Sequence, residues 1–309
     1  MQTALILWFS LAALSVAFVA YDLIFRTPEM KVMKWGWILV TLYTGIFGLL
    51  IYIFSCREPA PNTHEKFIAP LWKQTIGSTI HCMAGDATGV IVVAFITALL
   101  NLPMGLDSLL EYIAGFAFGL FIFQSLFMKD MLGGSYAEAV KKSWYPEWLS
   151  MNFVMAGMIP IMITLMTSNM KNMDVASLSF WGIMSLASLA GGILAFPVNW
   201  WLVKNKLKHG MGTERALGKG GSAEGRQMNM PGMNKSIVSE HFGDTLAPSQ
   251  IANTRMSTMN MESKVPIRSK VLVALLSVFI LAIGIGVAYY FGNMSMRPHG
   301  EMEKMEMQK

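Results

Sequence analysis

The sequence predicts an all-α integral membrane protein with about seven transmembrane helices, four of which form a core. Hydrophobic residues make up 54% of the 309 positions and charged residues only 14%, whereas typical soluble domains carry about 25% charged residues. Several apolar runs approach the roughly 20 residues that an α-helix needs to cross a bilayer. These observations exclude the soluble fold classes and make the lipid bilayer an expected partner.

The positive charge of the chain is an orientation signal. The net charge is +5, but the basic residues lie in short loops between apolar segments, where Lys and Arg orient membrane helices. We therefore expect no nucleic acid among the partners. The two cysteines, Cys56 and Cys82, are too few for a disulfide framework and too far apart for a CxxC motif.

Two apolar segments open the chain, and we interpret residues 1–54 as a unit of two N-terminal transmembrane helices. The first covers residues 3–25, lacks the positive start of a secretory signal and is long enough to span. The second covers residues 35–54 and begins with Trp35 and Trp37, which suit a membrane interface.

Residues 72–208 are predicted to form the core four-helix membrane domain. A short uncharged turn at 101–107 makes its first two helices antiparallel neighbours. Gly115 and Gly119 of the second helix have the spacing that lets membrane helices approach closely, and we expect them to face Gly85 and Gly89 of the first. The remaining two helices are expected at residues 147–168 and 175–203.

The C-terminal third is predicted to hold one more span. Residues 209–269 are polar and rich in Gly, Ser and Asn, so we expect a disordered cytoplasmic linker. Residues 270–291 form the last transmembrane helix, and residues 292–309 form a Met-rich extracytoplasmic tail.

Counts of Lys and Arg place the loops at 55–73 and 129–148, like the linker, on the cytoplasmic side. The N-terminus is then expected inside. Arg26, Lys31 and Lys34 would fall outside in that topology, in conflict with the same rule.

The third apolar segment concentrates ionisable groups. An imidazole, a thiol, a thioether and a carboxylate, from His81, Cys82, Met83 and Asp86, fall within six residues of a membrane helix. Ionisable groups at that depth are costly and are a functional hypothesis by default. Helical spacing places Cys82 and Asp86 on one strip, which we expect to face the bundle interior.

Methionine is the second unusual feature, with 27 residues. In the helix expected at 147–168, methionines recur in steps of three and four within an arc of roughly 120°. Thioether, thiolate and imidazole groups are ligands that suit Cu(I). We therefore predict that the protein binds or transports a soft metal ion such as Cu(I), which is the only cofactor that we expect. The predicted metal ligands are His81, Cys82, Met83, Asp86, Met155, Met158 and Met162.

Two other interpretations stay open. Methionine also fills ordinary cores, so the chain can instead be a non-catalytic membrane scaffold or subunit. It can also be a proton-coupled carrier that uses Asp86 and His81 without metal. No hydrolase, metalloprotease or nucleotide-binding motif stands in a credible context, so we do not expect an enzyme. A second copy of the chain is a further partner to consider.

Three stretches carry a family resemblance: His81-Cys-Met-Ala-Gly-Asp86, Phe196-Pro-Val-Asn-Trp-Trp-Leu-Val-Lys204 and Leu207-Lys-His-Gly-Met-Gly-Thr213. Over roughly residues 70–212 the chain resembles a prokaryotic family of multi-pass membrane proteins known as domain of unknown function 4396. The resemblance implies a membrane domain of four helices in the prokaryotic cytoplasmic membrane and no established activity. It also implies that the position of Asp86 accepts small or other polar residues.

Overall fold

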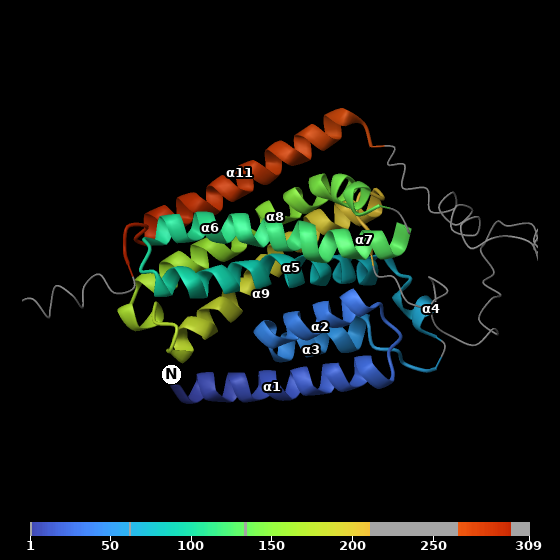
Figure 1. The fold of residues 1–309 in the computed structure, drawn as a ribbon, viewed down its shortest axis with the longest axis horizontal. Helices are drawn as coiled ribbons and strands as arrows, with labels where there is room; N and C mark the ends of the chain where they lie inside the picture. Colours follow the sequence, from blue (N-terminus) through green and yellow to red (C-terminus); the bar gives the residue numbers. More distant parts are fainter. Residues whose placement is uncertain (1, 62, 133–134, 211–264, 298–309) are drawn as a thin grey trace, which may run out of the picture.

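The computed structural model describes residues 2–61, 63–132, 135–210 and 265–297. This part of the chain is helical and contains no strand, and six of its helices are long and apolar enough to cross a membrane. The long helices run in roughly one direction (Figure 1). The predicted all-α membrane class is confirmed. Most of the predicted linker, at 211–264, and most of the predicted tail, at 298–309, lie outside the described residues.

The helices follow one another in this order: α1 (Gln2–Phe25), α2 (Lys31–Thr44), α3 (Ile46–Ser55), α4 (His64–Ile68), α5 (Leu71–Leu99), α6 (Met104–Ala117), the π-helix η1 (Phe118–Gln124), α7 (Ser125–Leu132), α8 (Tyr136–Thr167), the 3-10 helix η2 (Met170–Asn172), α9 (Leu178–Lys204) and α11 (Ile267–Phe291).

The second predicted span is instead a helical hairpin. The chain reverses at Gly45, whose φ of 59° is readily adopted only by glycine. Trp37 of α2 and Tyr52 of α3 then pack with ring centroids 5.3 Å apart. Helices of 14 and 10 residues are about 21 and 15 Å long, too short for a hydrocarbon core of about 30 Å. The hairpin therefore enters the bundle and returns to the same end.

This hairpin resolves the charge conflict of the predicted topology. Both of its ends lie at the end of the bundle where α5 begins (Figure 1), so Arg26, Lys31 and Lys34 share that end with the basic residues after α9. We call it the basic end. The N-terminus of α1 lies at the opposite end (Figure 1), whereas the predicted topology puts it on the same side as the loops at 55–73 and 129–148.

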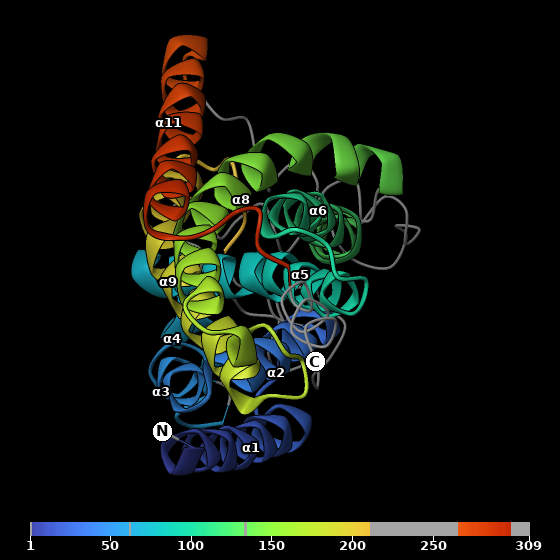
Figure 2. The same ribbon diagram turned by 90° about the vertical axis from the view of Figure 1, so that its left-hand side faces the viewer.

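Helices α5 to α9 pack around one another, with α1 at one outer edge of the molecule and α11 at the other (Figures 1 and 2). The predicted glycine contact is confirmed. A Cβ at Gly85 would lie 2.5 Å from the Cα of Gly119, and one at Gly89 would lie 2.8 Å from the Cα of Gly115. The backbones of α5 and of the α6–η1 helix are therefore in direct contact.

Helix α8 is longer than predicted and bends (Figure 2). It starts at Tyr136, after Ser135, whose hydroxyl accepts a hydrogen bond from the Glu138 amide at 3.2 Å. Residues 136–146, which the sequence places in the loop at 129–148, are therefore the first turns of the same helix. Pro146 and Pro160 lie inside α8, where each removes a backbone hydrogen bond and favours a kink.

Candidate functional site

Cys82 and Asp86 lie one helical turn apart on α5, and both are 0% exposed. The Cys82 Sγ atom is 3.0 Å from Asp86 Oδ2 and 3.0 Å from the Ser150 hydroxyl oxygen of α8. Ser150 in turn donates to Asn199 Oδ1 of α9 at 3.0 Å. Three helices therefore converge on the strip of α5 that the spacing of Cys82 and Asp86 predicts to face inward.

A buried ion pair lies beside this strip. Lys208, in the turn after α9, donates from Nζ to Glu147 Oε2 of α8 at 3.1 Å, and the side chains are 1% and 0% exposed. Burial alone would lower the pKa of the Lys208 ammonium, but Cys82, Glu147 and Asp86 raise it above its ordinary value. The neighbouring acidic groups therefore favour the charged form of Lys208. We call Cys82, Asp86, Glu147 and Lys208 the acidic cluster.

The two carboxylates of the cluster approach each other over Gly119 of η1. Asp86 Oδ1 and Glu147 Oε1 have no hydrogen-bond partner within the described part of the chain. A methyl group at Gly119 would clash with both of these oxygens. Cys82, Asp86 and Glu147 can each offer one ligand atom, and these three atoms lie within 4.8 Å of one another. A π-helix at this point is typical of functional sites, because its extra residue re-aims the helix.

The chemistry of the cluster follows from these contacts. Two carboxylates held together away from water are stable only if a proton or a cation compensates one of them. Lys208 supplies one positive charge, and one carboxylate stays uncompensated. A thiol and carboxylate oxygens together match borderline divalent ions such as Zn²⁺. The cluster can therefore hold either a proton or a metal ion.

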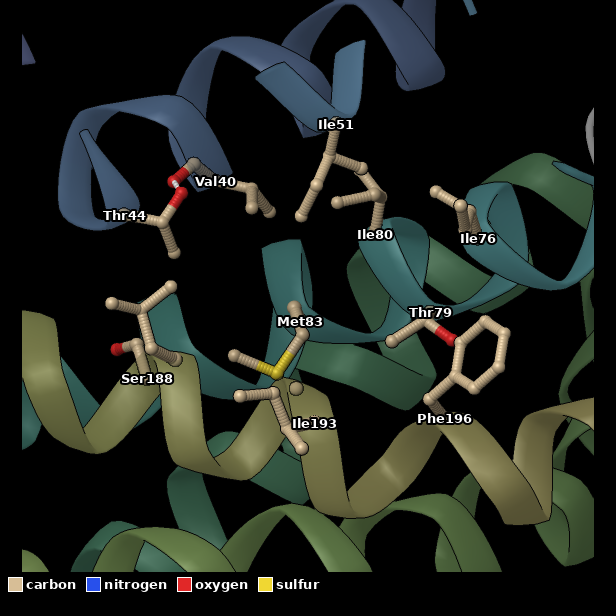
Figure 3. A pocket seen from close by; sticks show the side chains of 12 residues that line it. Val40, Thr44, Ile51, Ile76, Thr79, Ile80, Met83, Ser188, Ile193 and Phe196 are labelled. Carbon is tan, nitrogen blue, oxygen red and sulfur yellow. Dashed lines mark hydrogen bonds between the residues drawn. The ribbon is translucent and has the colours of Figure 1, made fainter. Parts of the chain in front are cut away.

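The other two α5 residues of the predicted site point elsewhere. His81 packs on Phe127 and Phe123, with ring centroids 4.7 and 6.0 Å apart. Met83 lines a cavity of about 340 Å³ between α2, α3, α5 and α9, whose other lining side chains are mostly apolar (Figure 3). Successive side chains of a helix diverge by about 100°, which separates His81, Cys82 and Met83.

The predicted ligands on α8 are all buried, at 0% for Met155 and Met158 and 1% for Met162. Met158 packs on Gly191 of α9, where a Cβ would lie 2.9 Å from its Cγ. Helix α8 reaches Cys82 through Ser150, and the three methionines lie about 8, 12 and 18 Å farther along the helix axis. Of the predicted ligands on α5 and α8, the structure therefore brings Cys82 and Asp86 together, and their partner from α8 is Glu147.

Sequence reasoning missed Glu147, Lys208, Ser150 and Asn199. Glu147 stands at the predicted start of a span, where a carboxylate is ordinary because it can reach the interface. Asn199 and Lys208 lie in the second and third stretches that carry the family resemblance. All three stretches therefore meet at one place, and this signal was available from the sequence.

The comparisons with known proteins agree with the resemblance. Residues 71–208 match the model of a family described as Domain of unknown function (DUF4396). The matched range begins at the first residue of α5 and ends at Lys208, so it contains the whole acidic cluster. No curated protein and no solved structure matches the chain.

Proposed function

We propose that residues 71–208 form a membrane domain that binds a divalent transition-metal ion at the acidic cluster and conducts it across the bilayer. One observation carries the proposal. Two fully buried carboxylate oxygens, from Asp86 and Glu147, have no partner among the described residues and face one point beside the Cys82 thiol. Intramembrane ionisable groups of this kind mark ion pathways more often than they stabilise a fold.

Charge balance favours a divalent ion. With Cys82, Asp86 and Glu147 ionised, the cluster holds three negative charges, and Lys208 contributes one positive charge. A divalent ion brings the sum to zero, which minimises the cost of burying charge in a low-dielectric interior. A monovalent ion such as Cu(I) would leave one negative charge. One sulfur and two carboxylate ligands are also closer to the preference of Zn²⁺ than to that of Cu(I).

Buried acidic side chains along α6 support passage in addition to binding. Glu111 is 2% exposed and Asp107 is 7% exposed, and the Thr97 hydroxyl of α5 bonds to Asp107. Glu111 lies eight residues before Gly119, or about 12 Å along the helix. Its Oε2 atom has no partner among the described residues. These groups extend the polar interior from the cluster toward the end opposite the basic end.

Cu(I) is the second candidate ion, and the buried methionines of α8 favour it. Met155, Met158 and Met162 offer thioethers, which are soft ligands that do not suit Zn²⁺. A path for Cu(I) would follow these sulfurs, with Cys82 at its inner end. The two ions therefore depend on different residues, which makes them separable by mutation.

The test is a metal titration of the full chain in detergent micelles. After treatment with a chelator, Zn²⁺ and Cu(I) are titrated in competition with a chromophoric chelator. We expect Asp86→Asn and Glu147→Gln each to weaken one Zn²⁺ site at least tenfold, since each removes a ligand charge. Met155→Leu is the matched control, because it is buried, close in volume and outside the cluster, and should leave Zn²⁺ binding unchanged.

Three outcomes decide between the candidates. Unchanged Zn²⁺ affinity in both cluster variants overturns the divalent site. Loss of Cu(I) binding in Met155→Leu, with Zn²⁺ binding unaffected by the cluster variants, assigns the path to Cu(I). Retained Zn²⁺ binding without protein-dependent Zn²⁺ uptake into proteoliposomes overturns conduction and leaves only binding.

A further inference from the structure

Outside residues 71–208, a second group of metal-binding side chains lies at the open end of the α2–α3 hairpin. Glu29 stands in the turn between α1 and α2, Cys56 follows α3 directly, and His64 is the first residue of α4. Each of the three is 0% exposed. Three segments that are separate in sequence therefore bring a carboxylate, a thiol and an imidazole to one buried point.

Only some of the polar atoms of Glu29, Cys56 and His64 have hydrogen-bond partners in the described residues. Glu29 Oε1 is 3.1 Å from His64 Nε2 and 3.4 Å from Cys56 Sγ. The other carboxylate oxygen, Glu29 Oε2, and the other ring nitrogen, His64 Nδ1, are buried without a hydrogen-bond partner in the described residues. Unsatisfied buried polar atoms are costly and call for a ligand or an ion.

The nearest basic side chain along the chain is directed to a different carboxylate. Arg57, the neighbour of Cys56, pairs through Nε with Asp22 Oδ1 at 3.2 Å. Asp22 also accepts hydrogen bonds from the hydroxyls of Tyr52 and Thr27, at 2.7 and 2.8 Å. Arg57 is therefore committed to Asp22, and the Glu29 carboxylate contacts the His64 imidazole and the Cys56 thiol instead.

We propose that Glu29, Cys56 and His64 form a second metal site, which takes a divalent ion of the zinc class. One ligand atom from each residue lies within 4.8 Å of the others. Tetrahedral zinc at 2.0 to 2.3 Å from its ligands needs ligand atoms roughly 3.3 to 3.8 Å apart, close to the 3.1 and 3.4 Å that separate Glu29 Oε1 from His64 Nε2 and Cys56 Sγ. A divalent ion also neutralises the carboxylate and the thiolate that bind it.

The site would tie the hairpin to the rest of the protein. Zinc here would join both ends of the hairpin, at Glu29 and Cys56, to α4, and its fourth position would remain for water. This linking role does not depend on the proposed function of the acidic cluster. The two sites are also separable, because the chain has only two cysteines and each site contains one of them.

Cobalt(II) provides the test, because a cobalt–thiolate bond gives a charge-transfer absorption band that oxygen and nitrogen ligands do not give. The full chain in detergent is stripped with a chelator and titrated with Co²⁺. In Cys82→Ser, any remaining thiolate band belongs to Cys56. We expect this variant to keep such a band with a stoichiometry of one Co²⁺ per chain, and Zn²⁺ to displace it.

Adding His64→Ala or Glu29→Gln to Cys82→Ser keeps the Cys56 thiol but removes another ligand. We expect each double variant to weaken the remaining Co²⁺ site at least tenfold, while size-exclusion chromatography reports whether it stays folded. Absence of a thiolate band in folded Cys82→Ser overturns the proposal. A band that His64→Ala and Glu29→Gln both leave unchanged overturns it as well.

If Cys82→Ser does not fold, the wild-type chain is compared with Cys56→Ser. Loss of one thiolate–cobalt equivalent in Cys56→Ser supports the second site, and an unchanged band overturns it. A failure of the acidic cluster alone would leave this result intact, because the variants of that cluster do not touch Glu29, Cys56 or His64.

Discussion

Replacing Lys208 with Met tests whether the acidic cluster holds charge away from water. Lys208 and Glu147 are 1% and 0% exposed and 3.1 Å apart, so Lys208→Met leaves the Glu147 carboxylate buried without its cation. Removing one partner of a buried ion pair costs about 3 to 5 kcal/mol. Folded proteins are stable by only about 5 to 15 kcal/mol, so this loss of unfolding free energy should be readily measurable.

The assay is the unfolding of metal-free protein in mixed detergent micelles, followed by tryptophan fluorescence. Lys204→Met is the matched control: Lys204 ends α9 and is exposed, and its loss should change the free energy of unfolding by less than about 0.5 kcal/mol. The double variant Lys208→Met with Glu147→Gln removes both charges and should recover most of the lost stability.

Either of two results would refute this reasoning. If the free energy of unfolding of Lys208→Met lies within about 0.5 kcal/mol of that of the control, water or another cation compensates the Glu147 carboxylate. A double variant no more stable than Lys208→Met would mean that packing of the lysine stem, and not its charge, stabilises the cluster.

Three further predictions follow from single residues. Gly119→Ala places a methyl group against Asp86 and Glu147, so chelator competition should show at least tenfold weaker Zn²⁺ binding, while Gly286→Ala, with open space around it, should bind normally. Burial and the charge of Lys142 lower the pKa of His209 to about 4, below its ordinary value of about 6.5. The unfolded state then binds the extra proton, so the free energy of unfolding should fall by up to about 3 kcal/mol between pH 6.5 and pH 4, and fall less in His209→Gln. Gly45→Ala forces a side chain into a backbone conformation with φ of 59° and ψ of −133°, which residues other than glycine rarely adopt, and should lower the free energy of unfolding by about 1 to 3 kcal/mol.

Each of these predictions has a contrary result. Equal Zn²⁺ affinity in the two glycine variants would place the metal away from Gly119. If the free energy of unfolding falls equally at low pH in the wild type and in His209→Gln, groups other than His209 cause the loss of stability. An unchanged unfolding free energy in Gly45→Ala would mean that the hairpin does not reverse there.

The membrane class and the inward strip of α5 were predictable because they depend on local patterns. Apolar length predicts the membrane class and six of the seven expected spans, and the four-residue spacing of Cys82 and Asp86 places them on one face. The spacing of Gly115 and Gly119 likewise predicts close contact with Gly85 and Gly89, since only glycine lets two membrane helices approach that far. Each of these inferences needs no knowledge of tertiary structure.

The reversal at Gly45 and the partners of the cluster were not predictable in the same way. The apolar run at 35–54 has the length of a span, and one glycine inside it is compatible with a straight helix. Glu147 and Lys208 are 61 residues apart, and only the packing of α8 against α9 joins them. His81 and Met83 were grouped with Cys82 because they are adjacent in sequence, although adjacent helical side chains point in different directions.

The most direct test of the central hypothesis is zinc X-ray absorption spectroscopy of the Cys56→Ser protein loaded with one equivalent of Zn²⁺. In that variant Cys82 is the only thiolate left, and it should supply a single sulfur ligand at about 2.3 Å, together with carboxylate oxygens at about 2.0 to 2.2 Å. A spectrum with only oxygen and nitrogen ligands would contradict the assignment of Cys82, Asp86 and Glu147 to one metal ion.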